Sequence, residues 1–256
     1  MRRRLSLRKS IYQQLSLLYW LPLRTAACNC LFNIYISGRN GEFRMKSFYD
    51  LASTRRSIRK FEDKDIPIED IKRCIRTAVT APSGCNSQCW RFVAIKDRDV
   101  INQMARAVIQ KMDEVLDEKK GELSEQYITS KRKIISFFTK APVVIAVFMT
   151  HLEFYDPVVI SALEDKGYDR EGIMKLFAYP DILSIGAAVQ NLLLALHESG
   201  YGACWMNEPT VAGEEINEIL KVSREQKFMS LIPVGFPAYT PREKELKDMG
   251  EVFSMI

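Results

Sequence analysis

Histidine is scarce in this 256-residue chain, and the cysteines show no metal-binding spacing. The only two histidines, His151 and His197, are far apart, and the four cysteines after residue 44 contain no Cys-x-x-Cys pair. Structural zinc sites need about four such ligands, so the sequence does not support a metal centre. A disulfide framework is also unexpected in a chain with room for an ample core, and reduced thiols in a cytoplasmic protein are the simplest interpretation.

The chain also lacks long apolar runs, internal repeats and low-complexity tracts. No run of about 18 uninterrupted apolar residues occurs, so the sequence predicts no membrane-spanning helix. The hydrophobic fraction of 47% and the charged fraction of 27% are ordinary for a soluble globular protein. The length suffices for one large domain or two small ones.

Basic charge is concentrated at one end of the chain. Residues 1–44 contain eight Lys and Arg residues against a single acidic residue, Glu42, which gives a net charge of +7. Because the whole chain carries +5, residues 45–256 carry −2. A nearly neutral body removes the main electrostatic argument for nucleic-acid binding.

The first 44 residues differ in character from the rest. A basic start leads into a short apolar stretch, residues 15–23, and then into Ala26-Ala27-Cys28, which loosely resembles a signal-peptide or lipoprotein cleavage site. Met45 stands directly before a helix-like segment. We predict that residues 45–256 form the domain. Residues 1–44 are then a disordered or dispensable extension upstream of a natural start at Met45, a targeting or membrane-surface segment, or a structural arm.

The patterning of the body predicts a mixture of helices and strands. Apolar spacing and capping residues predict helices at 47–53, 67–79, 99–109, 182–199 and 211–222. Short apolar and β-branched runs predict strands at 90–95, 142–149, 203–206 and 228–234, whereas residues 150–180 show no clear period. Because helices and strands do not alternate strictly, the predicted class is α+β, with a sheet between helices.

A basic segment, Arg55-Arg56-Ser57-Ile58-Arg59-Lys60-Phe61, follows the first predicted helix. Its arginines and its serine form a cationic site rich in hydrogen-bond donors. The planar fork of an arginine matches two oxygens of a phosphate, and a serine hydroxyl adds a further donor. The alternative is a solvated basic face, as most charge runs are.

A polar turn at residues 81–90, Ala-Pro-Ser-Gly-Cys-Asn-Ser-Gln-Cys-Trp, precedes the first strand. Its two carboxamides, Asn86 and Gln88, lie two residues apart. A carboxamide offers both a donor and an acceptor, which suits the edge of a pyrimidine or flavin ring. Taken alone, the segment is better explained as an ordinary turn with polar tips.

Two more segments complete a set of four. Residues 184–192 read Ser-Ile-Gly-Ala-Ala-Val-Gln-Asn-Leu and lead to Gly-Tyr-Gly-Ala-Cys-Trp-Met at 200–206, and residues 232–238 read Ile-Pro-Val-Gly-Phe-Pro-Ala. In this order and spacing, the four segments resemble the FMN-dependent nitroreductase family over about residues 45–253. Each motif is weak alone, but four in sequence order are specific.

This resemblance implies a three-layer α+β fold with a mainly antiparallel central sheet, in an interlocked homodimer with FMN at the interface. It implies that Arg55, Arg56, Ser57 and Arg59 hold the phosphate, the ribityl chain and the pyrimidine edge. The further implied contacts are Pro82 and Ser83 from the other subunit, Asn86 and Gln88 at the pyrimidine ring, Met206, Asn207 and Glu208 beside the reactive N5, and Arg242 or Lys244 at the phosphate.

The resemblance also implies a reaction. Hydride passes from NADH or NADPH to flavin N5 and then to a small electron-poor acceptor, such as a nitroaromatic or a quinone, with ping-pong kinetics. Arg59 close to N1 stabilises the negative charge of the reduced ring. Hydride transfer needs no side-chain acid or base, so the shortage of histidine is compatible with this reaction. The expected protein is cytoplasmic, without nucleic-acid or membrane partners.

Several alternatives stay open at this point. Reductive dehalogenation and flavin destruction are reactions of the same fold, although the sequence shows no matching lid motif. A protein that stores or senses FMN without turnover is a rival from another class. A membrane-associated or exported role driven by residues 1–44 is a third.

Three features have two interpretations each. The family usually has proline where this chain has Cys89, so this thiol and Cys85 are either neutral substitutions in a turn or oxidation-sensitive groups near the flavin. The aromatic residues of 150–180, Phe154 and Tyr155 among them, either stack on an acceptor or cap the core. Trp205 is either a packing residue or a catalytic one.

Overall fold

The structure is a computed structural model that describes residues 47–119, 121–150 and 156–256. The predictions made for residues 1–44, and those for Phe154 and Tyr155, concern residues outside the described ranges. Within those ranges no single helix is both long and apolar enough to cross a membrane, although one bent pair, Arg170–Leu176 with Pro180–Glu198, meets the length and composition requirements jointly.

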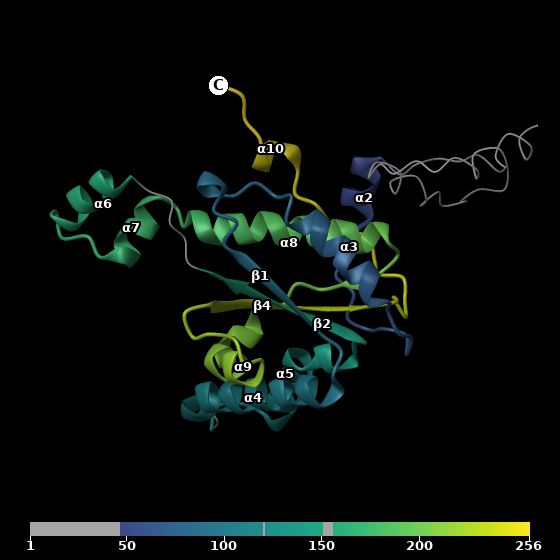
Figure 1. Cartoon of the computed structure of the whole chain (residues 1–256). Helices are drawn as coiled ribbons and strands as arrows, with labels where there is room; N and C mark the ends of the chain where they lie inside the picture. Colours follow the sequence, from purple (N-terminus) through teal and green to yellow (C-terminus); the bar gives the residue numbers. More distant parts are fainter. Residues whose placement is uncertain (1–46, 120, 151–155) are drawn as a thin grey trace, which may run out of the picture. The chain divides into compact units, whose positions relative to one another are not determined.

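A four-stranded antiparallel sheet lies at the centre of the domain (Figure 1). Its strands are β1 (Trp90–Ile95), β2 (Val143–Met149), β3 (Gly202–Ala203) and β4 (Lys227–Gly235). They are arranged in the order β1-β2-β4-β3, and β2 pairs with both of its neighbours over most of its length. Of the four strands, the short β3 pairs only with β4, at its C-terminal end, and is therefore the edge strand.

The central strand β2 separates two hydrophobic cores. Val143, Ile145 and Val147 face one core, and the alternating residues between them, such as Val144 and Phe148, face the other. All of these side chains are buried. The continuous apolar run is therefore a strand covered on both faces, as predicted.

Helices cover both faces of the sheet (Figure 1). One face carries α3 (Ile68–Ala78) and α8 (Pro180–Glu198), and the other carries α4 (Arg98–Leu116), α5 (Glu125–Ile135) and α9 (Gly213–Ile219). The other helices within the described ranges are α2 (Phe48–Thr54), α6 (Pro157–Glu164), α7 (Arg170–Leu176), α10 (Met249–Val252) and the short 3-10 helices η2 (Gly84–Asn86), η3 (Asp117–Lys119), η4 (Phe137–Lys140) and η5 (Glu208–Ala212). This arrangement confirms the predicted three-layer α+β fold.

Helix α8 is the element that organises the predicted site. It carries almost no charge, and nine of its residues are buried, among them Ile185, Val189 and Leu192. It packs along α3, in agreement with the prediction of a central helix. Its two ends hold different parts of the site.

Three local predictions need correction. Residues 156–176 form α6 and α7 instead of irregular structure, because the Asp156 and Asp169 side chains accept backbone hydrogen bonds at the start of each helix. The predicted helix at 211–222 is shorter: η5 precedes α9, and the chain reverses at Lys221, whose φ is 53°. The predicted strand at 203–206 is limited to β3 and an isolated bridge between Met206 and Leu231.

Candidate functional site

The basic segment lies along the edge strand β3. Ser57 forms a parallel bridge with Ala203, and the Ile58 N–H donates to the Ala203 carbonyl at 2.9 Å. Four residues further, Phe61 forms an antiparallel bridge with Pro237, just after β4. The structure thereby brings three of the four motifs together at one edge of the sheet.

Two glycines permit this close approach. A Cβ atom added to Gly202 would lie 2.7 Å from the Cβ of Ile58, and one added to Gly235 would lie 2.7 Å from the ring of Phe61. Real Cβ contacts are essentially never this short. The glycines of the Gly-x-Gly and Pro-x-Gly motifs therefore serve to seat the basic segment.

The three arginines of the segment have different surroundings. The Arg56 guanidinium donates to the backbone carbonyls of Ser53 (2.6 Å), Arg55 (2.9 Å) and Arg242 (3.2 Å), and so holds the segment to the C-terminal chain. Among the described residues, the Arg55 and Arg59 guanidiniums have no carboxylate within ion-pair distance and no hydrogen-bond acceptor. Two neighbouring cations without a protein partner are suited to an anionic ligand.

The sequence left open whether Arg242 or Lys244 lies at the phosphate, and the contact between Arg56 and Arg242 bears on this choice. The structure places the Arg242 backbone beside the basic segment, whereas no contact of Lys244 with that segment is found among the described residues. Both side chains are exposed. Arg242 is therefore the better placed of the two for a role at a phosphate.

The segment predicted to lie beside flavin N5, residues 206–208 (the N5 segment), follows β3 and runs along β4. Met206 and Leu231 exchange two backbone hydrogen bonds of 2.9 and 3.0 Å, which fix the path of the chain. Asn207 is exposed, and the Glu208 carboxylate forms an ion pair with Lys131 of α5. This pair ties α5 to the segment that the resemblance places beside the flavin ring.

The polar turn at residues 81–90 is strained and is hydrogen-bonded to α8. Cys85, Asn86 and Gln88 have φ values of 50°, 54° and 47°, in the left-handed region that non-glycine residues rarely adopt. The turn is anchored because the Gly84 N–H donates to the Ser184 hydroxyl at 3.1 Å. Such strain tends to occur at functional sites, which favours a functional turn over an ordinary one.

Replacing Cys85 with glycine is expected to relieve this strain. We expect a gain of up to about 1 kcal/mol in the free energy of unfolding, or about 2–4 °C in Tm, and weaker flavin binding because the turn loses its fixed shape. Thermal unfolding and flavin titration measure the two effects. Lys221→Gly, at a φ of 53° far from the turn, is the control and should raise Tm alone. Unchanged flavin affinity in Cys85→Gly would contradict the functional role of the strain.

The turn and the basic segment meet opposite ends of α8. Ser184 near its start contacts the turn, whereas His197 near its end lies 2.9 Å from the Thr54 hydroxyl, directly before the basic segment. These two positions are separated by about 20 Å along the helix axis, at 1.5 Å per residue. Within one chain, Asn86 and Gln88 therefore do not lie beside Arg55 and Arg59.

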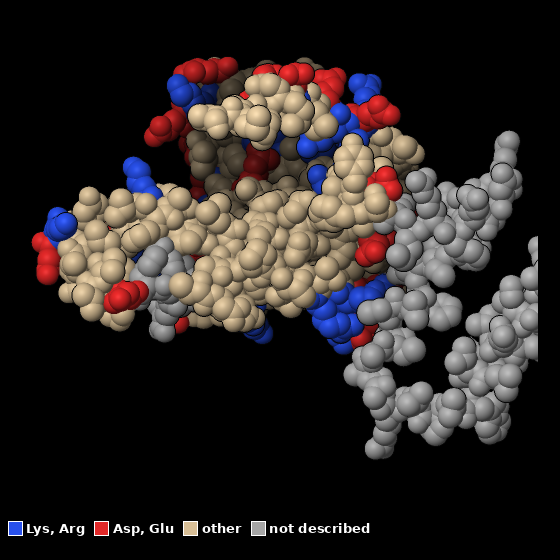
Figure 2. All heavy atoms as spheres, turned by 90° about the horizontal axis from the view of Figure 1, so that it is seen from above, with Lys and Arg blue, Asp and Glu red and all other residues tan. Residues whose placement is uncertain are grey.

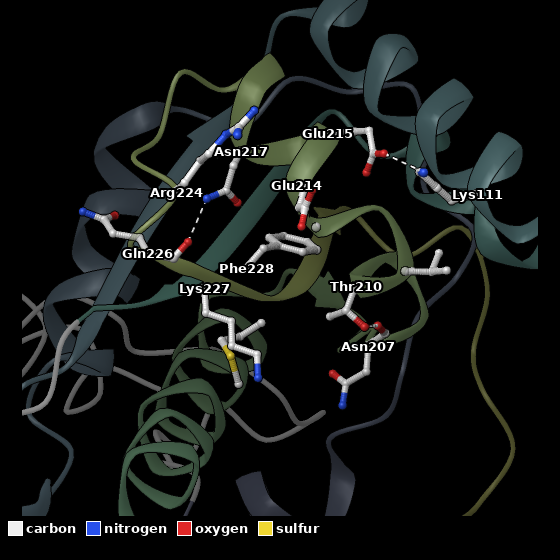
Figure 3. Close-up of a pocket in the computed structure, with 13 residues that line it drawn as sticks. Lys111, Asn207, Thr210, Glu214, Glu215, Asn217, Arg224, Gln226, Lys227 and Phe228 are labelled. Atoms are coloured by element: carbon white, nitrogen blue, oxygen red, sulfur yellow. Dashed lines mark hydrogen bonds and ion pairs between the residues drawn. The ribbon is translucent and has the colours of Figure 1, made fainter. Parts of the chain in front are cut away.

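A cavity of about 820 Å³ opens at the N-terminal end of β4 (Figure 3). Phe228 and Met229 form its apolar wall, and Asn207 and Thr210 line it on the side of the N5 segment. Three of its charged side chains are paired within the protein, Lys111 with Glu215 at 3.1 Å and Arg224 with Glu218. The basic segment, with its unpaired cations, does not line this cavity.

Cys85, Cys89 and Trp205, each of which had two interpretations in the sequence, differ in exposure. Cys89 is fully buried, and burial raises the pKa of its thiol, which opposes thiolate formation and favours the packing interpretation. Cys85 is exposed. Trp205 is 39% exposed and lies against α8 beside Gly186, where a Cβ atom would meet its ring at 3.9 Å.

Sequence reasoning missed two residues that shape the site. Ser184 anchors the turn, and Cys204 lies buried behind the basic segment. Ser184 was part of a quoted motif, but its hydrogen bond to residue 84 joins segments 100 residues apart and leaves no periodic signal. Cys204 was also part of a quoted motif, but a single cysteine next to a strand is normally a packing residue.

Comparison with known proteins identifies relatives over most of the domain. The sequence model of the Nitroreductase family matches residues 52–236. Human iodotyrosine deiodinase 1 is 29% identical over 209 residues, which cover 80% of this chain and 66% of that protein. The iodotyrosine deiodinase of Thermotoga neapolitana is 29% identical over 195 residues, which cover 75% of this chain and 90% of that protein. The chain thus spans just under two thirds of the human protein.

Solved structures show the same relationship. A BluB-like flavoprotein from Clostridium difficile 630 is 32% identical, with a TM-score of 0.72, and the match covers 83% of this chain and all of that one. An iodotyrosine deiodinase bound to FMN and 3-iodo-L-tyrosine is 25% identical, with a TM-score of 0.55, over 78% of this chain and 95% of that one. Together with the fold and the four motifs, these matches show that the chain belongs to the nitroreductase family.

Proposed function

We propose that the chain binds FMN and uses it for the reductive dehalogenation of a halogenated phenol of the iodotyrosine type. The relatives named above support this reaction, the alternative in the sequence analysis, better than the reduction of a nitroaromatic or a quinone. The neighbours described as nitroreductases are 20–24% identical and bear on the fold alone.

The observation that carries the cofactor assignment is the pair of unpartnered guanidiniums. Arg55 and Arg59 flank Ser57, which is bridged to the edge strand β3, and no described carboxylate neutralises them. A phosphate monoester supplies the missing negative charge and several acceptors. The residues present therefore fit FMN, whose phosphate and pyrimidine edge can each accept hydrogen bonds from a guanidinium.

The roles of the other residues follow from their placement. Arg56 holds the segment in position through backbone carbonyls, and its predicted contact with the phosphate or ribityl chain is part of this proposal. The segment 206–208, fixed by the bridge of Met206 to Leu231, would present its backbone to the reactive edge of the ring. When bound, FMN supplies two electrons. The carbon–halogen bond would break with loss of halide, a proton from water would complete the new C–H bond, and NADH or NADPH would restore the reduced cofactor.

The test uses the purified full-length chain. We expect a flavin spectrum and, with 3-iodo-L-tyrosine and a reductant, one iodide and one tyrosine released per two electrons consumed. Dithionite, NADH and NADPH are compared as reductants, with a nitroaromatic and a quinone as competing acceptors. Rapid reduction of these acceptors without iodide release would restore the nitroreductase interpretation. Bound flavin without any turnover would indicate FMN storage, and failure to bind micromolar FMN would refute the proposal.

The separation along α8 supports a homodimer as part of this proposal. A second copy with its α8 antiparallel to the first brings the turn of one chain, with Pro82, Ser83 and Asn86, to the basic segment of the other. The face that carries α8 is largely uncharged between its margins (Figure 2). Ile182 and Leu183 of α8 are 42% and 63% exposed, and removing such apolar surface from water favours association.

Replacing Leu183 with aspartate is expected to convert the dimer to a monomer and to lower flavin affinity at the same time. The buried charge opposes association, and without the second copy each site lacks its turn. Sedimentation and flavin titration measure both effects. Val115→Asp, on an equally exposed apolar residue of α4 on the opposite face, is the control and should change neither. A monomeric variant with full flavin affinity would show that one chain suffices.

A further inference from the structure

Lys131 of α5 and Glu208 of the N5 segment form an ion pair across 77 positions of the chain. The Lys131 side chain is 23% exposed and the Glu208 side chain is 45% exposed, so the ammonium is the better buried partner. Within the described residues, neither side chain has a second partner of opposite charge. Removing either charge therefore leaves the other one uncompensated.

The backbone of the N5 segment is held by contacts that do not involve this pair. Before Glu208, Met206 and Leu231 exchange backbone hydrogen bonds of 2.9 and 3.0 Å. After it, the backbone N–H and the hydroxyl of Thr210 both donate to the Asn207 carbonyl, at 2.9 and 2.7 Å. The path of the chain is thus fixed on both sides of Glu208, and the ion pair contributes chiefly a balance of charge.

Helix α5 is also attached to the domain without this pair. The Arg132 guanidinium donates to both carboxylate oxygens of Asp113 in α4, at 2.9 and 2.7 Å. Ile135 at the end of the helix is buried in the core. Neighbouring cations of α5 therefore differ in function, because Arg132 joins two helices whereas Lys131 neutralises the N5 segment.

The charge balance at Glu208 matters because reduction places negative charge on a flavin ring. An uncompensated carboxylate near the ring opposes this negative charge, and an uncompensated ammonium favours it. Such interactions act over several ångströms in a partly exposed site, since screening by salt at physiological strength has a length of about 8 Å.

We infer that Lys131 sets the reduction potential of the bound flavin by cancelling the charge of Glu208 beside the ring. This inference rests on the proposed function, which places residues 206–208 at the reactive edge of FMN. Lys131 acts through Glu208 and is a positioning residue in the electrostatic sense. Its role is to let the N5 segment carry a carboxylate without making the cofactor harder to reduce.

A charge effect has a signature that a structural effect lacks. Lys131→Met and Glu208→Gln break the same ion pair, so a purely structural role predicts that both variants change the cofactor in the same direction. Their charges are opposite, so the inference predicts potentials that shift in opposite directions. The double variant carries neither charge and should return close to the parent value.

The test is equilibrium reduction of the FMN-loaded full-length chain against a reference dye. Lys131→Met is expected to lower the ratio of reduced to oxidised flavin at a fixed potential by about three- to tenfold, the range for one charge near a partly exposed site. This change corresponds to a potential about 15–30 mV lower for two electrons. Glu208→Gln is expected to raise the potential by a similar amount, and Lys131→Arg, which keeps the charge, should retain the parent value.

Arg132→Met is the matched control, since it removes the adjacent cation of α5, whose partner is Asp113. It should lower Tm and leave the potential unchanged. The inference is overturned if Lys131→Met and Glu208→Gln shift the potential in the same direction, if neither shifts it, or if Lys131→Arg behaves like Lys131→Met. Should Lys131→Met not fold, Glu208→Gln decides, because an unchanged or lower potential in that variant also refutes the inference. A parent protein that binds no FMN refutes the proposed function instead.

Discussion

Replacing Arg59 with alanine should give a folded protein that purifies with little flavin. Arg59 is exposed, and its guanidinium makes no hydrogen bond or ion pair with the described residues, so its loss removes little from the fold. A hydrogen bond to a charged group contributes about 1.5–3 kcal/mol, so FMN affinity should fall about 10- to 150-fold. Flavin titration followed by fluorescence measures this change.

The same variant tests the charge of the reduced cofactor. If Arg59 lies at the pyrimidine edge, it stabilises the reduced anion, and its loss lowers the two-electron potential by about 30 mV for each 1.4 kcal/mol. Arg91→Ala is the control, because Arg91 is an exposed strand arginine whose partner is Gln226 at 3.1 Å. A variant that loses affinity without a change in potential would place Arg59 at the phosphate instead of the ring.

The elements with a strong local pattern could be predicted from sequence. The strand at 90–95 coincides with β1, and the ends of the predicted 142–149, 182–199 and 228–234 segments lie within two residues of those of β2, α8 and β4. These segments are long or continuously apolar, and their burial is decided by their own composition. Helices α6 and α7 were missed because most of their apolar residues are exposed or half-buried, with Ile173 an exception, and the caps at Asp156 and Asp169 are their main signal.

The assembly of the site depends on contacts that no local pattern encodes. The arginines were recognised by residue type, but their pairing with β3 joins Ser57 to Ala203 across 146 positions. The strained φ values of Cys85 and Gln88 could not be predicted from the sequence, because neither residue type favours that conformation. Their strain is sustained by Ser184 from a distant helix, so tertiary structure overrides local preference there.

Adding a single methyl group at the buried Gly202 is expected to abolish flavin binding, although Gly202 itself is not one of the predicted flavin contacts. In Gly202→Ala the new Cβ would lie 2.7 Å from the Cβ of Ile58 and 2.7–2.8 Å from its branches, atoms that a β-branched side chain cannot rotate away. The basic segment must therefore move off β3, at a cost of about 1–3 kcal/mol, and Ser57 and its arginines leave their common orientation. Thermal unfolding reports the cost, and FMN titration reports the loss of the site.

Gly213→Ala separates this effect from the general consequence of adding a methyl group to a glycine. There the new Cβ meets Phe228 at 3.7 Å, an ordinary contact, so stability and flavin binding should both be retained. Gly235→Ala should reproduce the defect of Gly202→Ala, because its Cβ meets Phe61 at the other end of the same segment. If Gly202→Ala and Gly235→Ala both bound FMN like the parent, the packing of the basic segment against β3 and β4 would not determine the cofactor site. The arginines would then have to act from a conformation other than the one that these two glycines permit.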